Sequence, residues 1–180
     1  ADAIRGTSIK LVHLSTGCLY KSTAKKIILE NEPPNFFDLS YNRSKIYAEN
    51  YLKEQPKESN ILILRLRLPL DAQAHRKNLL TKLIRYKTVI NNPNSITYIP
   101  DFIEALKHLI QIDARGVYNV VNKGSLRYPQ LLEMYRRYRP KFKYSIISFK
   151  DLNLIRTNLI LSTAKLEKTG FPVRSIKDVL

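Results

Sequence analysis

Short apolar stretches alternate with longer amphipathic stretches along most of this chain, and that alternation limits the fold more than any other feature. A short apolar run bounded by turn residues is typical of a strand that is buried on both faces. Successive parallel strands need a crossover connection, which is usually a helix. The predicted strands cover residues 10–15, 60–69, 95–99 and 116–121, and the predicted helices cover residues 41–55, 78–86, 101–112 and 129–138. The sequence therefore predicts an α/β fold with a parallel, helix-flanked sheet.

A long loop is predicted over residues 21–40, between the first strand and the first helix. The pair Pro33-Pro34 excludes a continuous helix or strand there. Ser40 is the predicted N-cap of the helix that follows, and Pro56 ends that helix. In a parallel sheet such a loop folds back over the carboxyl end of strand 10–15, which is where ligand sites of open α/β sheets lie.

The few glycines of the chain exclude one hallmark of a complete dinucleotide-binding sheet. They lie at positions 6, 17, 116, 124 and 170, and none of them forms a G-x-G-x-x-G turn. That turn lets backbone N–H groups approach the pyrophosphate of the cofactor. We therefore expect only the carboxyl-terminal part of such a sheet, with strand 10–15 at an open edge.

Cysteine and histidine usage indicates a reducing compartment and no metal site. Cys18 is the only cysteine, which excludes an internal disulfide and a thiolate-based metal site. His13, His75 and His108 lie on different predicted elements without ligand spacing. No apolar run is long enough for a membrane span, and the first residues lack the features of a signal peptide, so the cytoplasm is the expected location.

A net charge of +16 raises nucleic-acid binding as an alternative function. Residues 1–100 contain sixteen Lys and Arg against eight acids, and residues 101–180 contain fifteen against seven, so the charge is spread along the chain. Residues 133–144, EMYRRYRPKFKY, interleave basic and aromatic side chains. Such a segment suits single-stranded nucleic acid through phosphate neutralisation and base stacking. The other interpretation is a helix and a strand whose aromatic faces belong to the core.

One pair of residues has the spacing of an acid/base site. Tyr41 and Lys45 are four residues apart on a predicted helix, so their side chains project from one face. A neighbouring cation favours the ionised form of a phenol, which suits it to proton transfer. Eleven tyrosines and eighteen lysines make a chance Tyr-x-x-x-Lys pair expected, so the pair gains meaning only from its context. That context is Thr16, a hydroxyl residue at the end of the first buried strand.

With these residues the chain resembles the extended short-chain dehydrogenase/reductases. The segments LVHLSTGCLY, ENEPPNFFDLSYNRSKIYAENYL, ILILRLRLP, IPDFIEAL, GVYNVVNKG and LILSTAKLEKTGF occur in the order and approximate spacing of that family, over nearly the whole chain. The resemblance implies the C-terminal part of a Rossmann-like parallel sheet with a small substrate-binding α/β lobe. It also implies a catalytic triad of Thr16, Tyr41 and Lys45, and an N-terminal dinucleotide-binding half that this sequence lacks.

Two details make the chain most similar to nucleotide-sugar enzymes of rhamnose biosynthesis, namely dTDP-4-dehydrorhamnose reductase and the bifunctional 3,5-epimerase/4-reductase. The strand end reads Ser15-Thr16-Gly17-Cys18, and residues 78–86 match the pattern N-x-x-T-K-x-x-R-Y. The resemblance implies NADP(H), or NAD(H), as cofactor and a nucleotide-diphosphate sugar as substrate. The implied reaction is NADPH-dependent reduction of a nucleotide-linked 4-keto-6-deoxy sugar, with 3,5-epimerisation.

The resemblance also implies a role for each candidate residue. Tyr41 donates a proton to the 4-keto oxygen, Thr16 binds that oxygen, and Lys45 holds the cofactor ribose. Cys18 and Lys82 are the implied acid/base residues of epimerisation. The implied cofactor-binding residues are Tyr41, Lys45 and Pro69, and the implied substrate-binding residues are Asn78, Arg67 and Arg85.

Each of these assignments has a structural alternative. Cys18 is equally compatible with packing, because cysteine is among the most buried residue types. Lys82 is equally compatible with a solvated helix position. Arg67 and Arg85 suit the oxygens of a diphosphate, but they also suit exposed ion pairs.

Two parts of the chain are expected. Residues 1–72 form the C-terminal part of the dinucleotide-binding domain, with the catalytic Thr and Y-x-x-x-K. Residues 73–180 form mainly the substrate-binding lobe, with interleaved sheet elements. A homodimer is compatible with this arrangement. The alternative function is a degenerate reductase relative that serves as a basic nucleic-acid-binding or structural subunit, whereas the retained Thr16, Tyr41 and Lys45 favour a fragment of an enzyme.

Overall fold

The structure is a computed structural model that describes residues 1–21, 26–56, 59–152 and 154–180. Its strands are β1 (Leu11–Thr16), β2 (Ile27–Ile28), β3 (Ile61–Leu66), β4 (Pro69–Leu70), β5 (Thr88–Ile90), β6 (Thr97–Tyr98), β7 (Gly116–Asn119), β8 (Ser145–Ile147) and β9 (Ile160–Leu161). Its α-helices are α1 (Ser40–Lys53), α2 (Leu79–Leu83), α3 (Ile99–Gln111), α4 (Tyr128–Tyr138) and α5 (Ala164–Glu167). Short 3-10 helices cover Asp2–Ile4, Gly17–Leu19 and Phe149–Asp151. The predicted order of strands and helices is confirmed.

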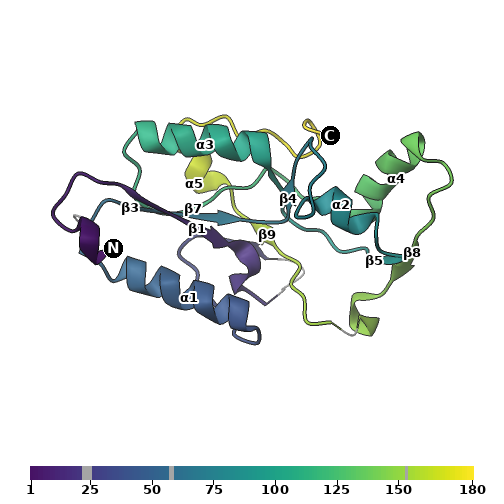
Figure 1. Ribbon diagram of the computed structural model, residues 1–180, viewed down its shortest axis with the longest axis horizontal. Coiled ribbons are helices and arrows are strands. Elements are labelled where there is room, and N and C mark those ends of the chain that lie inside the picture. Colours follow the sequence, from purple (N-terminus) through teal and green to yellow (C-terminus); the bar gives the residue numbers. More distant parts are fainter. Residues whose placement is uncertain (22–25, 57–58, 153) are drawn as a thin grey trace.

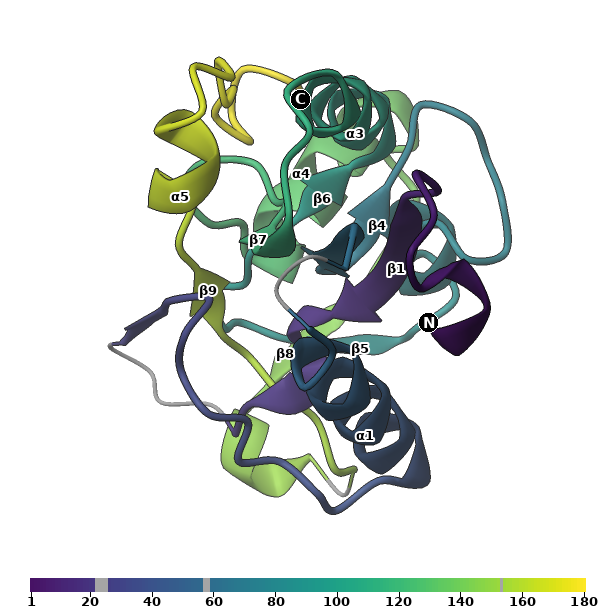
Figure 2. The same ribbon diagram turned by 90° about the vertical axis from the view of Figure 1, so that its left-hand side faces the viewer.

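The central sheet is parallel, as the alternation of segments predicts, and its strand order is β1-β3-β7. Leu11 pairs with Ile61, and Leu62 pairs with Gly116, so β3 is the middle strand. Helices α3 and α5 lie on one side of this sheet and α1 lies on the other (Figure 1, Figure 2). The predicted α/β class with a helix-flanked parallel sheet is therefore confirmed.

Strand β3 is buried on both faces, which explains why its sequence is almost continuously apolar. Leu62 and Leu64 pack on the side of α3 and α5, in a cluster with Phe102. Ile61 and Ile63 pack on the side of α1. Because side chains of a strand point alternately to its two faces, both faces of β3 need apolar residues.

A second core lies beside the central sheet, around α2, α4 and the parallel pair β5–β8 (Figure 1). Its buried members include Leu83, Val89, Tyr128 and Leu132. The short parallel pair β4–β6 lies where the chain passes from the sheet to this second core. These two cores are consistent with two parts of the chain, and the boundary at residue 72 stays a prediction.

Three local expectations are corrected. The strand expected over residues 60–69 is interrupted, because Leu68 takes a φ of 42° and β4 turns away to pair with β6. Ser40 is not the N-cap of α1: it is already helical, and Leu39 caps the helix without a side-chain hydrogen bond. The loop expected over residues 21–40 contains β2, which pairs with β9, and residues 22–25 of that loop lie outside the described residues.

None of the helices in the described ranges is long and apolar enough to cross a membrane.

Candidate active site

The carboxyl end of β1 turns sharply into a single turn of 3-10 helix over Gly17–Leu19. Thr16, the last residue of the strand, is buried, and its Oγ1 accepts a hydrogen bond of 3.1 Å from the backbone N–H of Cys18. A side chain at position 17 would place its Cβ 2.9 Å from Cδ1 of Leu161, so the close approach favours glycine there. The turn thus holds Thr16 and Cys18 side by side.

Helix α1 is fastened to this strand end by two side chains. Nδ2 of Asn42 donates to the carbonyl of Cys18 at 2.7 Å, and Nζ of Lys45 donates to the carbonyl of Leu14 at 2.8 Å. Tyr41 lies in the first turn of the helix and is 52% exposed. The structure therefore brings Thr16, Cys18, Tyr41 and Lys45 to one end of the sheet, as the strand-end rule predicts.

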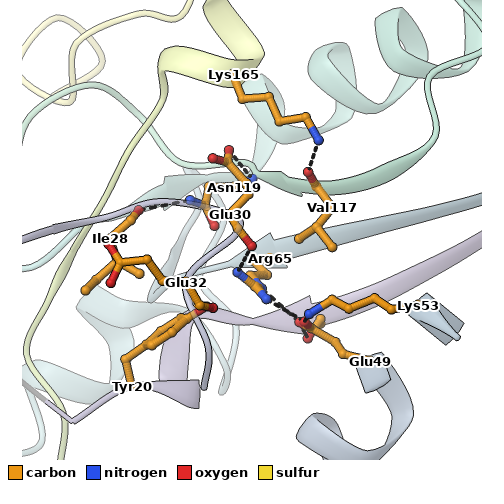
Figure 3. A network of polar contacts seen from close by, with 11 residues as sticks. Tyr20, Ile28, Glu30, Glu32, Glu49, Lys53, Arg65, Val117, Asn119 and Lys165 are labelled. Atoms are coloured by element: carbon orange, nitrogen blue, oxygen red, sulfur yellow. Dashed lines mark hydrogen bonds and ion pairs between the residues drawn. The ribbon is translucent and has the colours of Figure 1, made fainter. Parts of the chain in front are cut away.

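A buried ion pair lies under this site and connects α1 to two strands (Figure 3). Glu49 of α1 accepts hydrogen bonds from Arg65 Nε at 2.9 Å and Arg65 Nη2 at 2.6 Å, and from Ser15 Oγ at 2.5 Å. Burial raises the pKa of Glu49, but the hydrogen bonds and charge of Arg65 outweigh burial and lower it to about 2. Glu49 is thus a carboxylate that fixes the position of the helix.

Sequence reasoning missed this ion pair, although two signals for it were available. Glu49 follows Tyr41 and Lys45 at intervals of four residues, so all three share a face of α1. Arg65 and Arg67 interrupt the apolar sequence of the predicted strand 60–69 at an interval of two, so both are expected on one face of that strand. Charged residues at such positions are rarely buried without a partner.

Arg67 is buried, with a relative exposure of 3%. Its Nη1 donates to Sγ of Cys18 at 2.7 Å and to Oγ1 of Thr157 at 2.9 Å. Its Nη2 donates to Oδ1 of Asn94 at 2.9 Å and to the carbonyl of Thr157. A contact between Arg67 and a substrate diphosphate stays a prediction, and the buried position of the guanidinium argues against it.

The remaining candidates lie around α2. Lys82 and Pro69 line one pocket of about 220 Å³, and Arg85 lines a neighbouring pocket of about 240 Å³. The two pockets share four lining residues, which are Leu83, Tyr86, Tyr128 and Arg156. The structure thus places Lys82, Pro69 and Arg85 along one hollowed region.

Asn78 has a different environment. Its Oδ1 caps α2 by accepting from the N–H of Leu80, while its Nδ2 donates to the carbonyls of Asp71 and Gln73. These bonds hold the loop before α2 in place, so a direct contact with substrate requires one of them to open. Substrate binding by Asn78 stays a prediction.

Tyr128 and Arg156 are pocket residues that sequence reasoning missed. Tyr128 is buried, and burial raises the pKa of its phenol, while the charges of Arg67 and Arg156 lower it and Cys18 raises it. Tyr128 also lines both pockets. The guanidinium of Arg156 lies 6.0 Å from the centre of the Tyr86 ring. No signal in the sequence connects these residues, because they come together only through the packing of the second core.

The aromatic side chains of residues 133–144 are mostly engaged within the molecule. Tyr135 meets Phe142 edge-on with ring centres 5.2 Å apart, and Phe142 stacks on Tyr144 at 6.1 Å. Tyr138, at 82% exposure, is the one with a free face. Base stacking on this segment stays a prediction, and the packing of three of its four aromatic rings within the molecule argues against it.

Comparison with known proteins finds relatives that match the chain over its full length. No family model matches the chain. It is 30% identical, over its full length, to an Arabidopsis thaliana trifunctional UDP-glucose 4,6-dehydratase/UDP-4-keto-6-deoxy-D-glucose 3,5-epimerase/UDP-4-keto-L-rhamnose-reductase, of which it covers 28%. It is also 30% identical, again over its full length, to the Arabidopsis thaliana bifunctional dTDP-4-dehydrorhamnose 3,5-epimerase/dTDP-4-dehydrorhamnose reductase, of which it covers 63%. The chain thus spans less than two thirds of the length of these relatives.

Solved structures agree with these relatives. The UDP-rhamnose synthase of Acanthamoeba polyphaga mimivirus superposes with a TM-score of 0.82 at 25% identity, covering 94% of this chain and 62% of that one. The dTDP-4-dehydrorhamnose reductase of Bacillus anthracis, solved with NADP, superposes with a TM-score of 0.73 at 20% identity, covering 92% of this chain and 61% of that one. The chain is therefore similar in sequence, over its full length, to the two Arabidopsis thaliana enzymes, and it shares its Rossmann-like fold with the two solved enzymes.

Proposed function

We propose that the protein reduces a nucleotide-linked 4-keto-6-deoxy sugar with NADPH, after epimerising the carbons beside the ketone. The observation that carries the proposal is the meeting of Thr16, Cys18, Tyr41 and Lys45 at the carboxyl end of β1. The homologues named above carry the epimerase and reductase activities in their names, which supports the same reaction here.

In the reduction, Tyr41 donates a proton to the 4-keto oxygen as the adjacent carbon is reduced. Its phenol is suited to this because it is half exposed at the strand end. Thr16 binds the same oxygen: its Oγ1 already accepts from the N–H of Cys18, which leaves its hydroxyl hydrogen to donate. Lys45, tied to the carbonyl of Leu14, keeps a positive charge beside Tyr41.

The residues present fit the nicotinamide-ribose part of the cofactor. Tyr41 and Leu14, at 52% and 46% exposure, leave the region around Lys45 open to a ligand. Tyr41 and Lys45 are the residues that would hold the ribose, and Pro69 is expected beside them. When bound, the dinucleotide supplies the hydride that reduces the keto carbon.

For epimerisation, Cys18 removes a proton from a carbon alpha to the ketone, and Lys82 returns one from the other face. The negative charge that develops on the ketone oxygen is stabilised by Thr16 and Tyr41. The substrate's diphosphate is assigned to Arg85, because this arginine is exposed and lines the pocket next to Lys82. Tyr86 and Arg156, shared by both pockets, complete this part of the site.

The test uses the protein that contains this chain, with UDP-4-keto-6-deoxyglucose and NADPH. We expect NADPH to be oxidised, which is followed by the loss of its absorbance, and we expect UDP-rhamnose in the product. Cys18→Ser is expected to block epimerisation and to spare reduction of a ketone that is already epimerised. The absence of both cofactor oxidation and a rhamnose product would contradict the proposal.

The location and the assembly belong to the same proposal. A single free cysteine is consistent with a reducing compartment such as the cytoplasm. A homodimer and binding of nucleic acid stay predictions. The nucleic-acid alternative predicts an RNA affinity that falls with salt and is unchanged in Tyr41→Phe. It also predicts that this affinity is lost when Arg136, Arg137 and Arg139 are neutralised.

A further inference from the structure

Arg67 is a buried cation for which no described carboxylate serves as counter-ion. Arg65, two residues earlier and near the end of β3, is also buried but is paired with Glu49. Among the residues that the structure describes, Arg67 forms no ion pair, and its Nε has no hydrogen-bond partner. A buried charge is strongly unfavourable unless it is paired and hydrogen-bonded. The charge of Arg67 therefore points to an anion beside it.

Among the described groups to which Arg67 donates hydrogen bonds, the one that can become an anion is the thiol of Cys18. Nη1 of Arg67 lies 2.7 Å from its sulfur, whereas its other partners, Thr157 and Asn94, are neutral. Nδ2 of Asn94 donates a 2.8 Å hydrogen bond to Oδ1 of Asn158, so the acceptor that orients the guanidinium is itself held in place. An N–H donor aimed at sulfur favours the thiolate over the thiol.

We propose that Arg67 is a positioning residue that holds Cys18 as a thiolate, oriented to act as the base of epimerisation. This inference rests on the proposed function. The thiolate takes a proton from a carbon alpha to the ketone: the C–H bond breaks, an S–H bond forms, and the electron pair moves to the ketone oxygen. Lys82 returns a proton to the opposite face of that carbon, and exchange with water restores both residues. No oxidant or reductant is needed.

The first experiment measures alkylation of Cys18 by iodoacetamide at pH 7 and pH 9, followed by mass spectrometry of the peptide that contains it. We expect folded wild-type protein to react at pH 7 nearly as fast as at pH 9. In Arg67→Met the rate at pH 7 is expected to fall about ten-fold relative to pH 9, since only the thiolate reacts. Arg67→Lys restores part of that rate, and Arg137→Met, which removes an exposed arginine, leaves it unchanged.

Thermal melting followed by circular dichroism checks that each variant folds. If Arg67→Met does not fold, wild-type protein is compared folded and in urea. The inference is overturned if the ratio of the Cys18 alkylation rates at pH 7 and pH 9 is the same in folded wild-type protein as in the unfolded chain. An unchanged ratio in folded Arg67→Met overturns it as well.

The second experiment separates this inference from the proposed function. Exchange of substrate hydrogens for deuterium beside the ketone, measured by NMR in deuterium oxide, reports proton removal without the reduction step. We expect Cys18→Ser to abolish exchange and Arg67→Met to slow it about ten-fold or more. If deuterium exchange is lost in Cys18→Ser but complete in Arg67→Met, only the role of Arg67 is rejected. Full exchange in Cys18→Ser rejects the role proposed for Cys18.

Discussion

Tyr41 differs from the other tyrosines of α1 in what surrounds it. Tyr47 is six residues further along the helix than Tyr41 and therefore projects from a different face, and Tyr51 donates to Asp2. Tyr41 lies where Asn42 and Lys45 bind the end of β1. The three tyrosines of α1 therefore allow the same substitution to be compared at different positions of one helix.

We expect Tyr41→Phe to lower the rate of reduction by roughly 10²–10⁴-fold, the usual contribution of a general acid. The phenyl ring keeps the packing and removes only the proton donor. Tyr47→Phe is the control and is expected to leave the rate unchanged. The measurement is the initial rate of NADPH oxidation on a ketone that is already epimerised, and a Tyr41→Phe variant with the wild-type rate would argue against the assignment.

At this scale the sequence predicted positions better than environments. Thr16, Cys18, Tyr41 and Lys45 could be brought together in advance, because a general rule places the ends of parallel strands and the following loops at one edge. The surroundings of Arg67 and Asn78 could not be predicted. Their partners come from Thr157 and Asn94 in one case and from a local loop in the other, and neither set follows from strand or helix periodicity.

Helix α1 is positioned by a carboxylate rather than by apolar packing alone. Glu49 is fully buried and is bound by Arg65, Ser15 and Lys53. Removing one partner of a buried ion pair leaves the other charge uncompensated. Glu49→Gln is therefore expected to lower the free energy of unfolding by about 3–5 kcal/mol, measured by urea denaturation.

A matched variant tests whether the loss comes from the buried pair. Glu104 forms an exposed ion pair with Lys107, so Glu104→Gln is expected to change stability by less than about 1 kcal/mol. Equal effects of the two substitutions would contradict a structural role for the Glu49–Arg65 pair.

The pH dependence of folding follows from the same element. The pKa of Glu49 is about 2 in the folded protein against 4.5 for an ordinary glutamate, so its contribution is present above pH 4.5 and is lost as the pH falls towards 2. Burial, with a smaller effect of Lys45, lowers the pKa of His13 below 6.5, which also disfavours folding as the pH falls below that value. We expect thermal stability to fall from pH 7 towards pH 3, and the fall below pH 4.5 to be shallower in Glu49→Gln.

Element types followed from periodicity, whereas element ends did not. The short apolar run of β3 and the helical spacing of α1 are local features of the sequence, so both elements could be predicted. The end of β3 depends on the left-handed backbone of Leu68, which no residue preference announces. The short pairs β2–β9 and β4–β6 join segments far apart in the chain, so they depend on tertiary packing.

The whole molecule is built from interleaved segments of the chain rather than from two consecutive units. Strand β7 follows α3 in the chain but pairs with β3 in the central sheet. The backbone N–H of Thr97 donates to the carbonyl of Arg67 at 2.7 Å, and that of Val120 donates to the carbonyl of Arg65 at 2.9 Å. The expected division at residue 72 therefore crosses paired backbone, which favours cooperative unfolding of both cores.

Leu64 in the sheet core and Leu132 in the second core are both fully buried, so each offers a matched truncation. Leu64→Ala and Leu132→Ala are each expected to lower the free energy of unfolding by about 2–5 kcal/mol. Because paired backbone links residues on both sides of position 72, we expect one transition in both variants, with coincident midpoints by circular dichroism and tyrosine fluorescence. A second transition confined to Leu132→Ala would show that the region around α2 and α4 unfolds by itself. In that case the two pockets around α2 would open without loss of the Thr16–Tyr41 end of the sheet, and the substrate binding proposed for them would be coupled to folding of that region.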